Sequence, residues 1–178
     1  NDGGGFCECE RCKKLDNPGR RIRADDGTIT ARQILTDRLF AYANEVAREF
    51  HKSRPDRRLM MFAYTSAYID PPERLKLEPS LVVQFCPSCD DFWQPKAREQ
   101  MLERLDGWSK SCDRVAIWEY LDVEDWPCLP RPYLDLEADG IKQYWKRGAR
   151  YFFSQSADDF ATNGPAYYLA AKLAWNPQ

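Results

Sequence analysis

The sequence predicts an α/β fold with a parallel sheet, the second half of a (β/α)8 barrel. Four short apolar runs lack helical spacing, as in strands buried on both faces, and three of them are clearly followed by helical segments. The loops after these runs are long and carry most of the unusual residues, whereas the loops before them are short and plain. That asymmetry is typical of a barrel, whose sites lie at the C-terminal ends of the strands.

The length of the chain supports half a barrel rather than a whole one. A complete barrel takes about 250 residues, whereas this chain has 178 and four strand–helix units. We therefore expect 1–178 to be a single domain whose partner, the N-terminal half of the barrel, lies outside this sequence. A doubly wound open sheet is disfavoured because no glycine-rich phosphate loop follows any strand.

The four strands are expected to be parallel and to neighbour one another in chain order. They are predicted at Leu59–Tyr64, Leu81–Phe85, Val115–Tyr120 and Arg150–Ser154.

A helix is predicted ahead of the first strand, over Thr30–Phe50. Thr30 followed by Gln33 fits a capping box, in which the two side chains satisfy backbone N–H groups at a helix start. Apolar residues recur at helical spacing and predict the buried stripe, which is Leu35, Leu39, Tyr42, Val46 and Phe50.

Three further helices follow the later strands. One begins at Pro95, a residue suited to the first helical turn. Its expected buried stripe is Met101, Leu102, Leu105 and Trp108. Another covers about Leu136–Trp145 and ends at Gly148, and the last is expected to open at Pro165 and stop at Pro177. The proline-rich stretch between the first two strands has room for at most a turn of helix.

Composition excludes several classes of function. Hydrophobic residues make up 43% and charged residues 30%, an ordinary globular balance, and the net charge of -2 does not suggest a nucleic-acid surface. No apolar run is long enough to span a bilayer. His51, the single histidine, stands at the end of the first helix, so a Ser-His-Asp or Cys-His mechanism is not supplied by this chain.

Carboxylates and aromatic residues collect where the predicted strands end. This mixture suits sugars, because flat rings stack on the apolar sugar face while acids and amides hydrogen-bond the hydroxyls. The predicted substrate-binding residues are Tyr64, Tyr68, Trp93, Tyr120, Trp126 and Gln155. Taken singly, the nearby loop acids Asp122, Asp125, Asp158 and Asp159 are better explained as solvated surface residues.

Two acids stand apart as candidate catalytic residues. Asp2 sits beside a glycine-rich turn just past a strand inferred to precede the chain. Glu119 interrupts an apolar strand, where burial of an unpaired charge would cost several kcal/mol. Paired carboxyls about 5–10 Å apart are the usual machinery for breaking a glycosidic bond, so we expect the two acids to converge on one face at that separation.

Seven cysteines form the other signal. Cys7, Cys9 and Cys12 share one loop in a C-x-C-x-x-C spacing, and Cys89 ends a second C-x-x-C pair. Free thiols are the weaker alternative, whereas structural zinc bound by these four residues and disulfides between the two loops explain the pattern equally well. Either would pin the loop that carries Asp2, and no other cofactor is required.

Four stretches resemble a bacterial domain-of-unknown-function family, number 4838, among the glycoside-hydrolase TIM barrels. They are "NDGGGFCECERCKK", "AYTSAYIDPPERLKLEPSLVVQF", "WSKSCDRVAIWEY" and "YLAAKLAWNP". The similarity runs nearly end to end and covers the later part of the family domain. It implies an exported protein (periplasmic, cell-surface or extracellular) with a carbohydrate-facing rim. It also implies that Asp2 and Glu119 are the acids at the fourth and seventh strand ends, although a glutamate expected near Ser154 is missing.

Three functions are consistent with these observations. The first is a glycoside-hydrolase-like domain that acts on a polysaccharide or glycoconjugate through Asp2 and Glu119. The second is a non-catalytic carbohydrate-binding barrel, and the third is a structural zinc or thiol-rich module.

Overall fold

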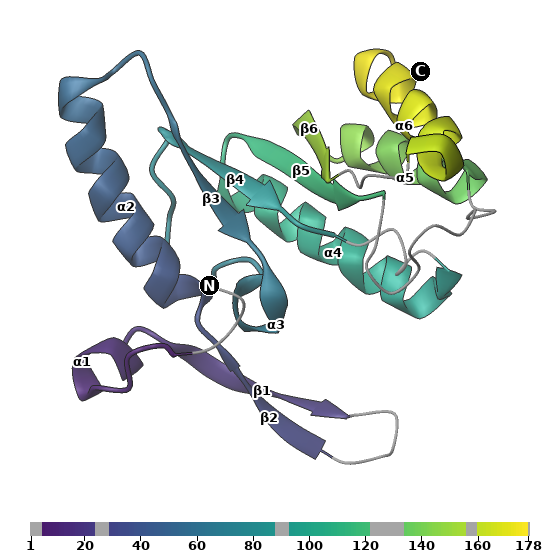
Figure 1. Ribbon diagram of the computed structural model, residues 1–178. Coiled ribbons are helices and arrows are strands. Elements are labelled where there is room, and N and C mark those ends of the chain that lie inside the picture. The colour runs from purple at the N-terminus through teal and green to yellow at the C-terminus, as the bar shows by residue number, and fades with distance from the viewer. Residues whose placement is uncertain (1–4, 24–28, 88–92, 122–133, 156–159, 178) are drawn as a thin grey trace.

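A parallel four-stranded sheet with helices along it forms the body of the protein (Figure 1). The computed structural model describes residues 5–23, 29–87, 93–121, 134–155 and 160–177. In chain order the elements are α1 (Glu10–Lys13), β1 (Asn17–Arg23), β2 (Ile29–Ile34), α2 (Thr36–Ser53), β3 (Leu59–Ala63), α3 (Thr65–Tyr68), β4 (Leu81–Phe85), α4 (Pro95–Ser111), β5 (Val115–Tyr120), α5 (Leu134–Lys146), β6 (Ala149–Gln155) and α6 (Phe160–Trp175).

The predicted sheet is confirmed. Its strands lie in the order β3-β4-β5-β6, and each neighbouring pair is parallel. The second and third strands occupy their predicted residues, while β3 ends one residue early and β6 gains one residue at each end. Parallel strands in chain order, with helices between them, are the arrangement of half a (β/α)8 barrel.

The two faces of the sheet differ sharply. On one face, α2, α4 and α5 bury a continuous core against β4 and β5. The largest fully buried side chains there include Phe40 from α2, Trp108 from α4 and Phe85 from β4. On the opposite face, termed the open face, Val82, Gln84 and Ala116 of the central strands are buried, whereas four large apolar side chains on the edge strands are 41–53% exposed. They are Met60, Phe62, Tyr151 and Phe153.

A bulge in β6 sets which of its side chains reach the open face. Val115 pairs with Ala149, but the next residue, Ala116, pairs with Tyr151, so Arg150 is an extra residue in the strand. Ala149 faces the helix side and belongs to the core cluster, whereas Tyr151 is 49% exposed.

The predicted helix over Thr30–Phe50 is wrong in its first turn. Residues Ile29–Ile34 instead form β2, which pairs antiparallel with β1, and the helix begins at Thr36. Isoleucine and threonine favour strands because their branched side chains fit a pleated sheet. The strand partner supplied by β1 therefore prevails over the capping-box pattern.

The predicted buried stripe of this helix is only partly right: Leu35 is buried as predicted, and Leu39 and Phe50 are half-buried. Tyr42 is 72% and Val46 39% exposed, whereas Phe40, Ala43 and Ala47 face the core. The face of α2 that packs on the sheet is therefore rotated from the predicted one: it carries Phe40 between small residues, while Tyr42 and Val46 lie toward solvent.

The later helices are confirmed with one correction. Pro95 occupies the first turn of α4, whose residues Met101, Leu105 and Trp108 are buried as predicted. Gly148 follows α5 with a φ of 98°, in the left-handed region that glycine adopts without strain. Pro165 lies inside α6 rather than at its start, where its missing N–H removes one hydrogen bond of the helix.

Candidate functional site

Three of the predicted substrate-binding residues lie at the C-terminal edge of the sheet. Tyr64 follows the last residue of β3, while Tyr120 and Gln155 end β5 and β6 and pair directly in register. Burial raises the pKa of Tyr120, with further contributions from neighbouring Cys86 and from Tyr64, to which Tyr120 is hydrogen-bonded. The ends of β3, β4 and β5 therefore bring these phenol and thiol groups together.

The backbone is strained at the same edge. Thr65, the residue after Tyr64, has a φ of 54° although it is β-branched. Its hydroxyl oxygen accepts a hydrogen bond of 3.3 Å from the amide of Ala67. Strained residues of this kind cluster at binding and active sites, where the surrounding structure holds them in place.

Buried hydrogen bonds from α2 and α4 hold the segment that follows α3 in place. Asp70 is buried and accepts a hydrogen bond of 2.8 Å from the Arg104 guanidinium on α4. The indole N–H of Trp108 donates to the Ile69 carbonyl at 2.8 Å, and the Thr36 hydroxyl donates to the Asp70 carbonyl at the same distance. These contacts hold the connection that leads away from Tyr64 against the helix layer.

Glu119, predicted as a catalytic acid, faces the helix layer. Its side chain is on the same side of β5 as the core residues Val115 and Ile117, and the residue is 2% exposed. The Tyr144 hydroxyl on α5 donates a hydrogen bond of 2.6 Å to one carboxylate oxygen, and the Tyr120 amide donates to the other at 2.9 Å. The carboxylate is therefore satisfied within the protein.

Glu137 on α5 is a second buried acid, and it was not among the residues predicted from the sequence. It is 3% exposed, and neither carboxyl oxygen has a hydrogen-bond partner among the described residues. Burial first, and the charge of Glu119 second, raise its pKa to about 8. Glu137, Ile141 and Tyr144 follow helical spacing, and that signal could have identified it as inward-facing.

The open face of the sheet carries a row of aromatic rings. The Trp118 ring centroid lies 5.4 Å from that of Phe62 on β3 and 4.3 Å from that of Phe153 on β6. The indole Nε1 of Trp118 is buried without a hydrogen-bond acceptor among the described residues. In a closed barrel, side chains of this face would fill the interior.

The N-terminal cysteines are brought together as predicted. The sulfurs of Cys7, Cys9 and Cys12 all lie within 4.8 Å of one another, and all three are free thiols. A hydrogen bond from the Cys12 backbone, followed by those from the Cys7 and Cys12 side chains, lowers the pKa of Cys9 to about 7. The hydrogen bond with Cys9 is the largest cause that raises the pKa of Cys12 to about 11.

The remaining predicted site residues divide into two groups. Tyr68 is only 6% exposed and its ring lies edge-on to Phe6, with the centroids 6.4 Å apart, whereas Trp93 is 53% exposed just ahead of α4. Asp2, Cys89 and Trp126 lie outside the described residues, and so does the predicted convergence of Asp2 with Glu119.

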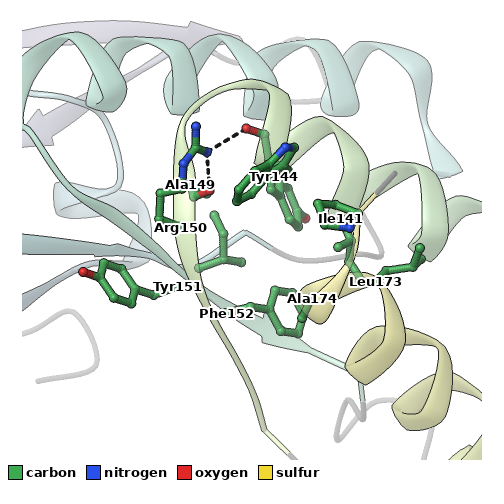
Figure 2. A pocket seen from close by; sticks show the side chains of 11 residues that line it. Ile141, Tyr144, Ala149, Arg150, Tyr151, Phe152, Leu173 and Ala174 are labelled. Atoms are coloured by element: carbon green, nitrogen blue, oxygen red, sulfur yellow. Dashed lines mark hydrogen bonds between the residues drawn. The ribbon is translucent and has the colours of Figure 1, made fainter.

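Two hollows lie away from the strand ends. The first is lined by residues of α5, β6 and α6, and in Figure 2 Arg150 bends back to hydrogen-bond nearby backbone carbonyls. Its volume of about 50 Å³ is far below the roughly 300–1,000 Å³ of ligand pockets. The second, about 500 Å³, lies between α4 and α5, where charges such as Arg147 and Asp106 already pair with each other.

Comparisons with known proteins give one match. The model of the family described as Domain of unknown function (DUF4838) matches residues 1–178, the whole chain. Neither the curated proteins nor the solved structures contain a match. Among the described residues, every helix is too short or too polar to cross a membrane.

Proposed function

The chain belongs to the family Domain of unknown function (DUF4838), and we propose that it is a glycoside-hydrolase-like domain that holds a saccharide at the C-terminal edge of its sheet. The observation that carries the proposal is the grouping of Tyr64, Tyr120 and Gln155 at that edge. Phenol rings offer a stacking surface for a sugar, and the amide of Gln155 can both donate to and accept from hydroxyls. The strained Thr65 beside them supports a binding role.

The open aromatic face supports a larger barrel. Rings as exposed as Phe62 and Phe153 form an apolar surface that proteins normally cover. We propose that four further strand–helix units complete the barrel over this face and supply an acceptor for the Trp118 indole. We further propose that the protein is exported and that its binding partner is a carbohydrate.

A second candidate function is a carbohydrate-binding barrel without catalysis. The burial of Glu119 and its bond to Tyr144 favour it, because a nucleophile or general acid must reach the substrate. The catalytic roles of Asp2 and Glu119 stay predictions.

One set of measurements tests both candidates. The protein is titrated with oligosaccharides by calorimetry and screened for turnover of aryl glycosides. Gln155→Ala and Tyr120→Ala should each weaken binding about 5–30-fold, since each loses a contact worth about 1–2 kcal/mol. Tyr42→Ala, which changes an exposed tyrosine on the outer side of α2, is the matched control and should bind normally.

The outcomes separate the candidates. Turnover that Glu119→Gln abolishes while binding persists supports the hydrolase. Binding that depends on Gln155 without any turnover supports the non-catalytic barrel. Neither binding nor turnover across a broad glycan panel would overturn the proposal.

A further inference from the structure

We propose that Cys7, Cys9 and Cys12 form a metal site that binds one zinc ion through three thiolates. This site is independent of the saccharide edge, and it takes a soft or borderline divalent cation rather than an organic ligand.

The distances between the sulfurs fit a single ion. In a tetrahedral zinc–thiolate site the Zn–S bond is about 2.3 Å, which places neighbouring sulfurs about 3.8 Å apart. The three sulfurs here already lie within 4.8 Å of one another. Only a small movement would therefore bring all three to bonding distance.

The backbone around the cysteines is organised as a turn that presents the thiols on one side. The Lys13 amide donates to the Cys9 carbonyl at 3.0 Å, and the Leu15 amide donates to the Cys12 carbonyl at 3.0 Å. These two bonds form the single turn of helix α1 and the turn that follows it, so the backbone that carries Cys9 and Cys12 is held in a fixed shape.

The loop is also anchored to α2 at both of its ends. One Arg38 nitrogen donates to the Cys7 carbonyl at 2.7 Å, while two others hold the Asp16 carboxylate at 2.6 Å each. Arg38 is 8% exposed, so the anchor is built into the interior. A loop held in this way loses little entropy when it closes on a metal.

Charge and access favour the bound ion. Three thiolates and one Zn²⁺ leave a net charge of about −1. The exposed residues of the same loop compensate it, since the three bases Arg11, Lys13 and Lys14 outnumber the two acids Glu8 and Glu10. Cys7 and Cys9 are exposed, so an ion can enter from solvent. The remaining tetrahedral position is left to water or to a residue outside the described ranges.

The direct test uses Co²⁺ as a spectroscopic substitute for zinc. Reduced, metal-free protein is titrated with Co²⁺ in the presence of a phosphine reductant, and one equivalent should produce intense thiolate-to-cobalt absorption that Zn²⁺ abolishes. Since loss of a supporting outer residue weakens metal sites about 10–100-fold, Cys9→Ser should weaken binding by more than about 100-fold. Cys112→Ser is the matched control, because Cys112 is a free thiol that directly follows α4 and does not belong to the cysteine cluster, so the change should leave the spectrum unchanged.

A second measurement needs no variant and so does not depend on the folding of Cys9→Ser. Alkylation of the unchanged protein is followed by mass spectrometry with and without Zn²⁺. Zinc should protect Cys7, Cys9 and Cys12 together and leave the rate at Cys112 the same. Absence of the cobalt band, equal loss of it in Cys112→Ser, or alkylation that zinc does not slow would each overturn the proposal.

Discussion

The Tyr144 hydroxyl on α5 donates a hydrogen bond of 2.6 Å to the carboxylate of Glu119 on β5. Both residues are 2% exposed, so the bond joins a buried donor to a buried acid. A carboxylate at the end of a strand is thereby held on the helix side of the sheet.

Removal of the Tyr144 hydroxyl should destabilise the protein. Tyr144→Phe leaves one carboxylate oxygen of Glu119 buried without its donor, which costs about 1–3 kcal/mol. Urea unfolding followed by circular dichroism measures the loss. Tyr42→Phe, at a tyrosine that is 72% exposed, is the control and should leave the free energy of unfolding unchanged. An equal effect of both changes would contradict the role of the bond.

Glu137 should make stability depend on pH. Its pKa is about 8 in the folded protein and 4.5 in the unfolded chain, so the unfolded chain releases the proton first as pH rises. The stabilising contribution is complete below pH 4.5 and is lost progressively up to about pH 8, at about 1.4 kcal/mol per unit.

Glu137→Gln removes this titration while keeping the shape of the side chain. Relative to the unchanged protein, the variant should gain stability as pH rises from 4.5 to 8, by up to a few kcal/mol. Thermal or urea unfolding across that range measures the difference. A difference that stays constant with pH would show that Glu137 titrates normally.

Replacement of Gly107 by alanine should destabilise α4 even though alanine is the better helix former. An added Cβ would lie 2.5 Å from the Cγ of Pro71, so helix and loop would have to separate. The expected cost of overpacking is about 1–3 kcal/mol, which outweighs the gain of up to about 1 kcal/mol from helix propensity. The exposed Lys110 on the same helix provides the control, and Lys110→Ala should have little effect on urea unfolding.

The open face should bind hydrophobic dyes. Phe153 is 50% exposed beside the Trp118 ring, so Phe153→Ser should lower ANS fluorescence of the chain. Tyr168→Ser, at a residue 66% exposed on α6, is the matched control and should leave the fluorescence nearly unchanged. If both changes lower it equally, the dye does not report on this face.

Local sequence patterns were sufficient to predict the parallel strands but not the β1–β2 hairpin. The runs at Leu81–Phe85 and Val115–Tyr120 are apolar on both faces, and that property alone identifies buried parallel strands. The hairpin of β1 and β2 depends on pairing between separate segments, one of them rich in arginine. Such pairing leaves little trace in the pattern of either segment.

Local sequence patterns also could not predict to which face of β5 the side chain of Glu119 points. The sequence indicated that the acid interrupts a buried strand, and the structure confirms the burial. In a strand covered on both faces, apolar residues on either side cannot show to which face a given side chain points. Tyr144, 25 residues further along the chain, provides the partner, so the direction of Glu119 is decided by tertiary contact.

The extra residue in β6 makes that strand tolerant of one particular change in length. Arg150 has no paired residue in β5. Its neighbours Ala149 and Tyr151 already pair with the consecutive residues Val115 and Ala116. Deletion of Arg150 would therefore give the strand regular alternation and leave Tyr151, with the rings beyond it, on the open face. A single codon could thus be lost at this position without disturbing the aromatic row, so homologues should differ in length here rather than elsewhere in the strand.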